Sequence, residues 1–308
     1  MILAATRGIT GLVIAWAVLG VGIGMGLYDP AFAALTWLYG REARSAITGI
    51  TLIAGFANTL GWPLSAVLLH EFGWRTACLI WAGLNILLAA PLNWLSIPRH
   101  GGSAALPQAA TASPAAVPPR AAMPIPAFFF AATWFVQGAM AAHLPALLQA
   151  AGASSTEAIA AAALVGPAQV GGRFVEFGVL RSFHPIAMAR FASVLHPIGA
   201  AFLVVLGAPG IIAFAVLHGA GNGLITIAKG ALPLALFGPH GYGLRSGLLS
   251  VPARVLQSAS PFLFGLLLDR VGIAAVGLSA RLCLAAFGSL FLLCPHRTVV
   301  AHPSPARG

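Results

Sequence analysis

Long runs of apolar residues follow one another along nearly the whole 308-residue chain. Each run is long enough to cross a hydrocarbon core of about 30 Å as a helix, and none alternates like a barrel strand. The pattern therefore predicts an all-α polytopic membrane protein. About nine runs are expected as transmembrane helices, over residues 11–37, 46–69, 76–95, 126–150, 155–172, 187–206, 211–232, 246–268 and 272–293.

The composition supports this class and argues against a water-soluble domain. Hydrophobic residues make up 59% of the chain and charged residues 7%, whereas a soluble domain is about 25% charged. The net charge of +10 does not indicate nucleic-acid binding, because the 16 basic residues are scattered singly, mostly at the ends of apolar runs. Basic residues at such positions set the orientation of spans. We therefore expect the lipid bilayer, and no nucleic acid, as a partner.

Patterns typical of enzymes and cofactor sites are missing from the sequence. It has no phosphate-binding loop ending in Lys-Ser/Thr, no Ser-centred elbow and no His-Glu-x-x-His. Gly22, Gly24 and Gly26 lie inside an apolar run, so they do not indicate a dinucleotide site. The three cysteines show no metal-ligand spacing. We expect no enzyme activity, no metal and no cofactor.

A stretch rich in Ala, Pro, Ser and Gly divides the chain at residues 100–123 and reads as a flexible linker. It separates a partial N-terminal bundle of three spans (1–99) from a C-terminal six-helix bundle (124–295), and a polar tail follows (296–308). With the linker on the cytoplasmic side, most basic residues, Lys229 among them, fall inside. The positive-inside rule thus predicts a plasma (bacterial inner) membrane protein with a cytoplasmic linker and C-terminus.

The chain also repeats itself weakly at a distance of about two hundred residues, as transporters built from two similar halves do. The matches keep a common order and nearly a common offset. They pair Gly24-Met25-Gly26-Leu27 with Gly221-Asn222-Gly223-Leu224, Tyr39-Gly40 with Phe237-Gly238, Arg44-Ser45 with Arg245-Ser246, and Pro63 before Glu71 with Pro261 before Asp269.

A basic turn between two apolar runs carries the pattern Gly-Arg-x4-Gly-x2-Arg, formed by Gly172, Arg173, Gly178 and Arg181. This pattern resembles the loop motif of the major facilitator superfamily of transporters, in its copy between helices eight and nine. The glycine-rich first run with Arg-x2-Arg after it, the second run ending in residues 71–75, and the long central linker extend the resemblance over nearly the whole chain.

The resemblance implies that the runs are spans four to twelve of a two-bundle transporter, and that the bundles rock about a central site. Spans one to three and the first-half loop motif have no counterpart, so the chain is either the product of an internal start or truncated gene, or a nine-span remnant. In the family, an ion pair at the loop motif helps stabilise one state. We therefore expect Arg173 and Glu176 to pair at the helix–loop junction; an exposed pair of little energetic weight is the alternative.

Ionisable residues inside spans are the candidates for proton coupling. Asp29 lies about eight residues before the inner end of the first run, roughly 12 Å deep. A carboxyl at that depth could take up and release a proton near neutral pH, because burial disfavours the charged form. Alternatively, Asp29 caps a helix that restarts at Pro30. His143, His196 and His218 are relay candidates or hydrogen-bonded packing residues.

Arg254 is the candidate for substrate binding, because it is embedded in a run and no acid lies within one helical turn of it. It could bind a carboxylate or phosphate bidentately, with Gln257 one turn further on. The alternatives are pairing with an acid on another helix, or snorkelling to the inner face. Further candidates for lining a cavity are Trp134, Gln137, Asn58 and Asn222.

These observations predict a secondary transporter that moves a small-molecule substrate by alternating access and uses the proton gradient. Efflux of a small amphipathic compound is the first expectation, since Gly55, Gly61 and Pro63 partly match the family's antiporter motif. Uptake of a small organic anion, bound by Arg254, is the alternative. A membrane remnant or sensor that binds a ligand without transporting it is a third possibility.

Overall fold

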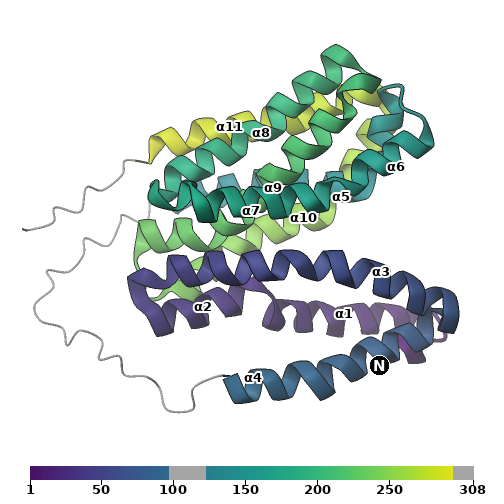
Figure 1. Ribbon diagram of the computed structural model, residues 1–308, viewed down its shortest axis with the longest axis vertical. Coiled ribbons are helices and arrows are strands. Elements are labelled where there is room, and N and C mark those ends of the chain that lie inside the picture. Colours follow the sequence, from purple (N-terminus) through teal and green to yellow (C-terminus); the bar gives the residue numbers. More distant parts are fainter. Residues whose placement is uncertain (97–122, 294–308) are drawn as a thin grey trace, which may run out of the picture.

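The N-terminal half is built from helices that double back on themselves (Figure 1). The structure, a computed structural model, describes residues 1–96 and 123–293; the expected tail and all of the expected linker except residue 123 lie outside these ranges. The chain reverses after the second helix at Gly40 (φ 57°), and the third helix breaks at Gly73 (φ 71°). A π-helical turn at Asn85–Ala89 follows. The helices of this half are α1 (Ile9–Gly26), α2 (Tyr28–Tyr39), α3 (Ala43–Leu84) and α4 (Ala90–Ser96).

The C-terminal half is a helical bundle whose axes run in nearly the same direction as α2 and α3 (Figure 1). Two hydrophobic clusters follow each other along the bundle. One surrounds Phe129, Leu224 and Leu290, and the other surrounds Leu147 and Phe214. The helices are α5 (Pro124–Ala150), α6 (Ser155–Ala163), α7 (Val165–Gly178), α8 (Pro185–Leu206), α9 (Ile211–Phe237), α10 (Tyr242–Val271) and α11 (Val276–Ser289).

Glycines allow α7 and α9 to approach closely. A Cβ atom on Gly172 would lie 2.5 Å from the carbonyl oxygen of Ala220, and one on Gly219 would lie 2.6 Å from that of Val165. A Cβ on Gly223 would likewise collide with the carbonyl of Gln169. Because lipid gives no hydrophobic drive for helices to associate, such backbone contact is the usual source of packing energy between spans.

The expected end of a span at residue 172 was wrong. Helix α7 continues to Gly178, so Gly172, Arg173 and Glu176 belong to the helix and not to a loop. Only residues 179–184 connect α7 to α8, and they include a 3₁₀ turn at Leu180–Ser182, which holds Arg181. The helix continues because its last turns pack against α3 and α9, which a hydropathy pattern does not reveal.

Within the described residues, seven helical stretches are long and apolar enough to cross a membrane: Ile9–Gly55, Val67–Leu95, Pro124–Ala150, Ser155–Gly178, Pro185–Leu206, Ala208–Phe237 and Tyr242–Leu292. This supports a polytopic membrane-embedded protein. The first and last stretches contain 47 and 51 residues, more than twice the roughly 20 residues of one crossing. Each includes a glycine of positive φ, Gly40 or Gly272, at which the chain turns. The expected number of crossings stays a prediction.

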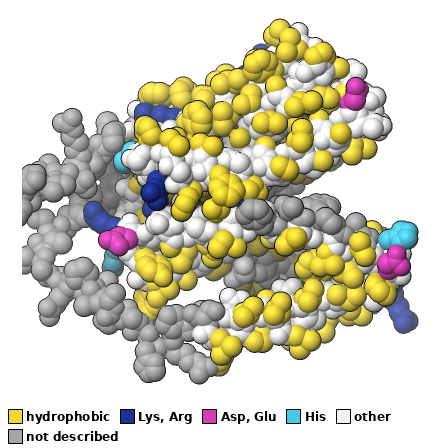
Figure 2. Space-filling view, viewed as in Figure 1, with side chains coloured by type: hydrophobic (Ala, Val, Ile, Leu, Met, Phe, Trp, Pro, Cys, Tyr) yellow, Lys and Arg dark blue, Asp and Glu magenta, His cyan; other side chains and the backbone are white. Residues whose placement is uncertain are grey.

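The surface matches a protein surrounded by lipid. Figure 2 shows hydrophobic side chains over most of the visible face, with most charged side chains gathered towards the two ends. A hollow separates the two halves towards the end that holds α6, whereas α2 and α3 contact α7, α9 and α10 elsewhere. In this contact Phe32 and Ile47 lie against Gly230, where a Cβ would be 2.8 Å from Ile47. The two halves thus meet directly along only part of their length.

Candidate functional site

A charged cluster lies where the N-terminal half meets the C-terminal half. The ammonium group of Lys229 on α9 donates to the carboxylate of Asp29 on α2, at 2.7 Å. The hydroxyl of Ser250 on α10 donates to the same carboxylate at 3.2 Å. The side chain of Lys229 is 4% exposed and that of Asp29 is 23% exposed. A buried charge needs such a partner, so loss of either member would leave a costly unpaired charge at the contact between the halves.

A second cation and an aromatic ring complete the cluster. Nη2 of Arg254 lies 3.4 Å from the Asp29 carboxylate, a longer and weaker contact, and the Arg254 side chain is 38% exposed. The ring of Trp134 on α5 lies 4.2 Å from Nζ of Lys229 and 4.6 Å from the guanidinium carbon of Arg254. Both distances are within the range of cation–π attraction. The cluster therefore combines two cations, one carboxylate and one indole ring.

Two glutamines extend the cluster along α5 and α10. Gln137 lies three residues after Trp134, and Gln257 three after Arg254, so each is one turn away on a similar face. The two helices approach closely at Gly138, where a Cβ would lie 2.8 Å from the carbonyl oxygen of Gln257. Both amides are partly exposed, and neither forms a hydrogen bond within the described chain. Of the separately predicted candidates, Trp134 and Arg254 thus lie in contact, whereas the side chain of Asn58 lies outside the described residues.

The other predicted candidates form a separate buried network in the C-terminal half. Nδ1 of His196 lies 2.9 Å from Nδ1 of His218, and Nε2 of His196 lies 2.9 Å from the hydroxyl of Ser279. The amide of Asn222 lies 3.3 Å from Nε2 of His218. Ser279 donates to the carbonyl of Val276, so donation can run in one direction from the Asn222 amide through neutral His218 and His196 to Ser279. The packing interpretation accounts for this network.

His143 lies apart from the other two histidines. Its Nε2 is 2.7 Å from the carbonyl oxygen of Pro261, at the contact between α5 and α10. A carbonyl oxygen only accepts, so the imidazole N–H of His143 donates here and links the two helices. The three histidines therefore do not form one relay: His196 and His218 lie together, and His143 joins two helices.

A second charged contact between the halves involves the stretch of residues 172–181, which carries the Gly-Arg-x4-Gly-x2-Arg pattern. The carboxylate of Glu176, which is fully buried, lies 3.2 Å from Nη2 of Arg44 on α3. Arg44 also donates to the carbonyl oxygens of Leu180 at 3.3 Å and Phe183 at 2.7 Å. It therefore binds the C-terminal end of α7 and the connection after it.

The expected pair of Arg173 with Glu176 does not form. Arg173 is buried, and its Nη1 donates to the carbonyl oxygen of Thr51 on α3, at 2.9 Å. Of the remaining motif residues, Gly178 ends α7 next to open space, and Arg181 lies 5.5 Å from the ring of Phe177. The motif thus contacts the other half through Arg173 and Glu176, each with its own partner.

The acidic residues divide into two groups. The chain has six, and four of them are exposed: Glu42, Glu71, Glu157 and Asp269. The other two, Asp29 and Glu176, each pair with a basic residue from the opposite half. Every carboxylate removed from solvent in this chain therefore takes part in holding the halves together.

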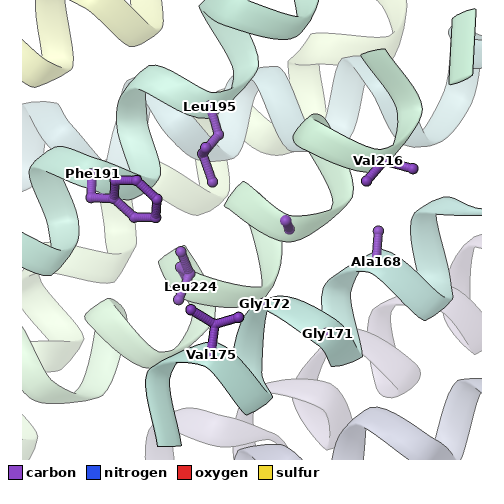
Figure 3. Close-up of a pocket in the computed structure, with 9 residues that line it drawn as sticks. Ala168, Gly171, Gly172, Val175, Phe191, Leu195, Val216 and Leu224 are labelled. Carbon is purple, nitrogen blue, oxygen red and sulfur yellow. The ribbon is translucent and has the colours of Figure 1, made fainter. Parts of the chain in front are cut away.

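An apolar cavity of about 330 Å³ lies between α7, α8 and α9 (Figure 3). Gly171 and Gly172 form part of its wall, because the absence of side chains leaves space there. No charged or hydrogen-bonding side chain lines it, so it gives no chemistry for selecting a polar solute. Its lining residues are Ala168, Gly171, Gly172, Val175, Phe191, Leu195, Val216, Ala220 and Leu224.

Sequence reasoning missed Lys229, Ser250 and Arg44. Lys229 was counted only among the basic residues on the inner side, and its burial and its pairing with Asp29 were not predicted. One signal could have found it: it is the single lysine among the 16 basic residues, and it lies within an apolar run. Ser250 lies four residues before Arg254, one turn away on the same helix face.

Comparison with known proteins adds no functional assignment. The chain matches no protein-family model, and no curated protein is significantly similar to it. Within the described residues, no group of three or more His, Cys, Asp or Glu side chains could hold a metal ion. The function is therefore argued from the charged cluster and from the contacts between the two halves.

Proposed function

We propose that the protein is a proton-coupled secondary transporter, which moves a small solute across a plasma membrane by alternating access of its two halves. The observation that carries the proposal is the cluster of Asp29 with Lys229 and Arg254, because it joins the halves through ionisable groups. Residues of this kind inside apolar spans usually mark ion or substrate pathways. The architecture proposed is that of the major facilitator superfamily, with nine crossings.

The internal repeat supports this architecture. Gly40 and Gly238, which align in the repeat, both have positive φ and follow the last residue of a helix. Gly73 and Gly272 follow the aligned acids Glu71 and Asp269 at nearly the same distance and also have positive φ. The turns of the first half thus recur in the second. Counting a crossing on each side of Gly40 and Gly272 turns seven apolar stretches into the nine proposed.

Protonation of Asp29 is the proposed coupling step. While Asp29 is ionised, its carboxylate attracts Lys229 and Arg254 and holds α2 against α9 and α10. A proton on Asp29 removes this attraction, so the cost of separating the halves falls. The pair of Arg44 with Glu176 is a second contact that must open when the halves separate on that side. Proton binding thereby changes the balance between two arrangements.

Proteoliposomes with a trapped pH indicator test this proposal. Candidate solutes, which include organic anions, amphipathic cations and sugars, are added outside, and the internal pH is followed. We expect at least one solute to change the internal pH with the wild-type chain, and Asp29→Asn to abolish the change. Asp269→Asn, at an exposed acid, is the matched control and should behave as the wild type.

Two results would contradict the proposal. Proton-linked flux that persists in Asp29→Asn would place the coupling group elsewhere. If no solute moves with the wild-type chain, yet some bind to it, the protein is the non-transporting ligand-binding protein considered above. Of the two substrate classes expected from the sequence, the second cation of the cluster favours the organic anion over an amphipathic compound.

A further inference from the structure

The charges of the cluster do not cancel. Lys229 and Arg254 face a single carboxylate, that of Asp29. The other buried acid, Glu176, pairs with Arg44, and the four remaining acids are exposed. Among the described residues, the cluster therefore carries one more positive charge than negative charge. A charge in an apolar region is costly unless it is paired, so the cluster favours an anion that the chain does not supply.

The open position is at Arg254 and not at Lys229. Lys229 is 4% exposed, and its carboxylate partner lies at 2.7 Å. Arg254 is 38% exposed, and its single hydrogen bond, to Asp29, is 3.4 Å long. A guanidinium has several N–H donors arranged to match a carboxylate in two parallel bonds. Most of these donors are free for a ligand.

The neighbours of Arg254 suit a small ligand with a polar head. The unpaired amides of Gln137 and Gln257 lie one turn from Trp134 and Arg254, on the two helices that approach at Gly138. An amide offers both a donor and an acceptor. Trp134 adds an apolar ring beside the guanidinium. A bound molecule would thus meet a charge, two amides and an aromatic ring.

We propose that this cluster binds a small organic carboxylate on Arg254, and that the anion and a proton on Asp29 favour each other's binding. The reason is electrostatic: a carboxylate on Arg254 would lie close to the Asp29 carboxylate and be repelled by it. A proton on Asp29 removes that repulsion and frees Lys229 to attract the ligand. Linkage requires the reverse as well, so the bound anion promotes protonation of Asp29. This inference rests on the proposed function and names its substrate class.

Calorimetric titration of the 308-residue chain in nanodiscs tests the inference directly. The probes are acetate and benzoate, with benzamide as a neutral molecule of the same shape as benzoate. Titration in two buffers of different ionisation enthalpy gives the number of protons taken up for each anion bound. We expect benzoate to bind more tightly at pH 5.5 than at pH 8, with proton uptake, and benzamide to bind at least about tenfold more weakly.

Variants separate the two parts of the inference. Arg254→Gln should weaken benzoate binding about tenfold or more, whereas Arg281→Gln, at an exposed arginine of α11, should leave it unchanged. Asp29→Asn should bind benzoate with the low-pH affinity at every pH and with no proton uptake. Arg254→Lys keeps the charge but loses the paired donors; it should bind weakly yet keep the pH dependence, which provides a test even if Asp29→Asn does not fold.

Several outcomes would overturn the inference. Equal binding of benzoate and benzamide would exclude recognition of the charge. Tight binding of benzoate to Arg254→Gln would exclude Arg254 as the residue that binds the carboxylate. The absence of acetate or benzoate binding at pH 5.5 to the wild type would exclude a carboxylate site. If benzoate binds with proton uptake but no solute crosses the liposome membrane, the anion site stands and the transport proposal fails. If another solute is transported and no anion binds, the transport proposal stands and the anion site fails.

Discussion

The two halves of the molecule have similar sequences in places but are packed very differently. In the C-terminal half, 61% of the most apolar part of Pro124–Ala150 is buried, and 67% of that of Ala208–Phe237. The corresponding fractions in the N-terminal half are 6% for Ile9–Gly55 and 0% for Val67–Leu95. Among the described residues of that half, the buried hydrophobic cluster around Phe32 and Ile47 includes Leu234 and Tyr242 of the other half.

Residues that align in the repeat are therefore similar in type but differ in the packing contacts that they make. Gly26 and Gly223 align in the repeat, yet Gly26 has open space where its Cβ would lie, whereas Gly223 touches the backbone of α7. The C-terminal half is stabilised by backbone contacts within itself. The N-terminal half depends on α2 and α3, which carry Asp29 and Arg44 and bind across the interface.

The largest expected effect concerns these aligned glycines. Gly223→Leu should destabilise the fold by about 3 kcal/mol or more, because the new side chain must separate α9 from α7. Gly26→Leu, the matched control, should change stability little. The measurement is the temperature at which a thiol-reactive dye labels buried Cys283, in a background where Cys78 and Cys294 are replaced by Ser. Equal losses for the two variants would contradict the difference between the halves.

The second effect concerns the interface itself. Asp29→Asn should cost about 2–3 kcal/mol, because it leaves the buried ammonium group of Lys229 without a counter-ion. The double variant Asp29→Asn/Lys229→Met should recover most of that loss, since it removes both charges. The same Cys283 labelling reports the effect, with Asp269→Asn as the control. A double variant as unstable as the single one would show that the pair itself, and not the orphaned charge, supplies the stability.

A smaller effect is expected at the other contact. Glu176→Gln should cost about 1–3 kcal/mol, because Arg44 loses a charged acceptor but keeps two carbonyl oxygens. The distribution of distances between spin labels at positions 41 and 181 should become broader, because the contact of Arg44 with Glu176 joins α3 to the end of α7. Glu157→Gln, at an exposed acid with a local cap, should change neither quantity. Unchanged label distances in Glu176→Gln would mean that Arg44 binds well enough through the carbonyls alone.

The smallest effect is a pH dependence of the folding stability, caused by His184. The ring of His184 caps α8 by accepting a hydrogen bond from the backbone N–H of Ile186 at 3.2 Å. Partial burial, with the charges of Arg44 and Arg190, holds the pKa of His184 below its ordinary value. The unfolded chain therefore takes up the proton first, near pH 6.5. The stability from neutral His184 is complete above that pH and declines as pH falls towards the lower folded pKa. His184→Asn keeps a cap but does not titrate, so this part of the decline should disappear.

The sequence predicts helices and the neighbours of a residue along one helix. It does not predict features that depend on contacts between residues far apart in the chain. The helical class follows from the apolar runs, and the grouping of Trp134 with Gln137 and of Arg254 with Gln257 follows from helical spacing. The end of α7 could not be placed, because Arg173 and Glu176 are buried by Thr51 and Arg44 from the opposite half. Hydropathy treats such residues as the start of a loop.

The candidate site was predicted only in part, because its residues come from distant parts of the chain. Asp29 and Arg254 were both recognised as embedded charges, but their meeting depends on a contact between residues more than two hundred positions apart. The pairing of Lys229 was missed, since a pattern of run ends does not reveal which basic residue has a buried partner. The network of His196 with Ser279 joins α8 and α11, and no spacing along one helix predicts it.

The way the cluster is divided between the halves has an electrical consequence. The negative charge of Asp29 belongs to the N-terminal half, whereas Lys229 and Arg254 both belong to the C-terminal half. A movement that separates the halves while Asp29 is ionised therefore separates opposite charges. A charge that crosses a potential of 100 mV changes in energy by about 2.3 kcal/mol, so even a fractional displacement along the field does electrical work. If such a movement has a component along the field, it would produce a transient current and respond to membrane voltage.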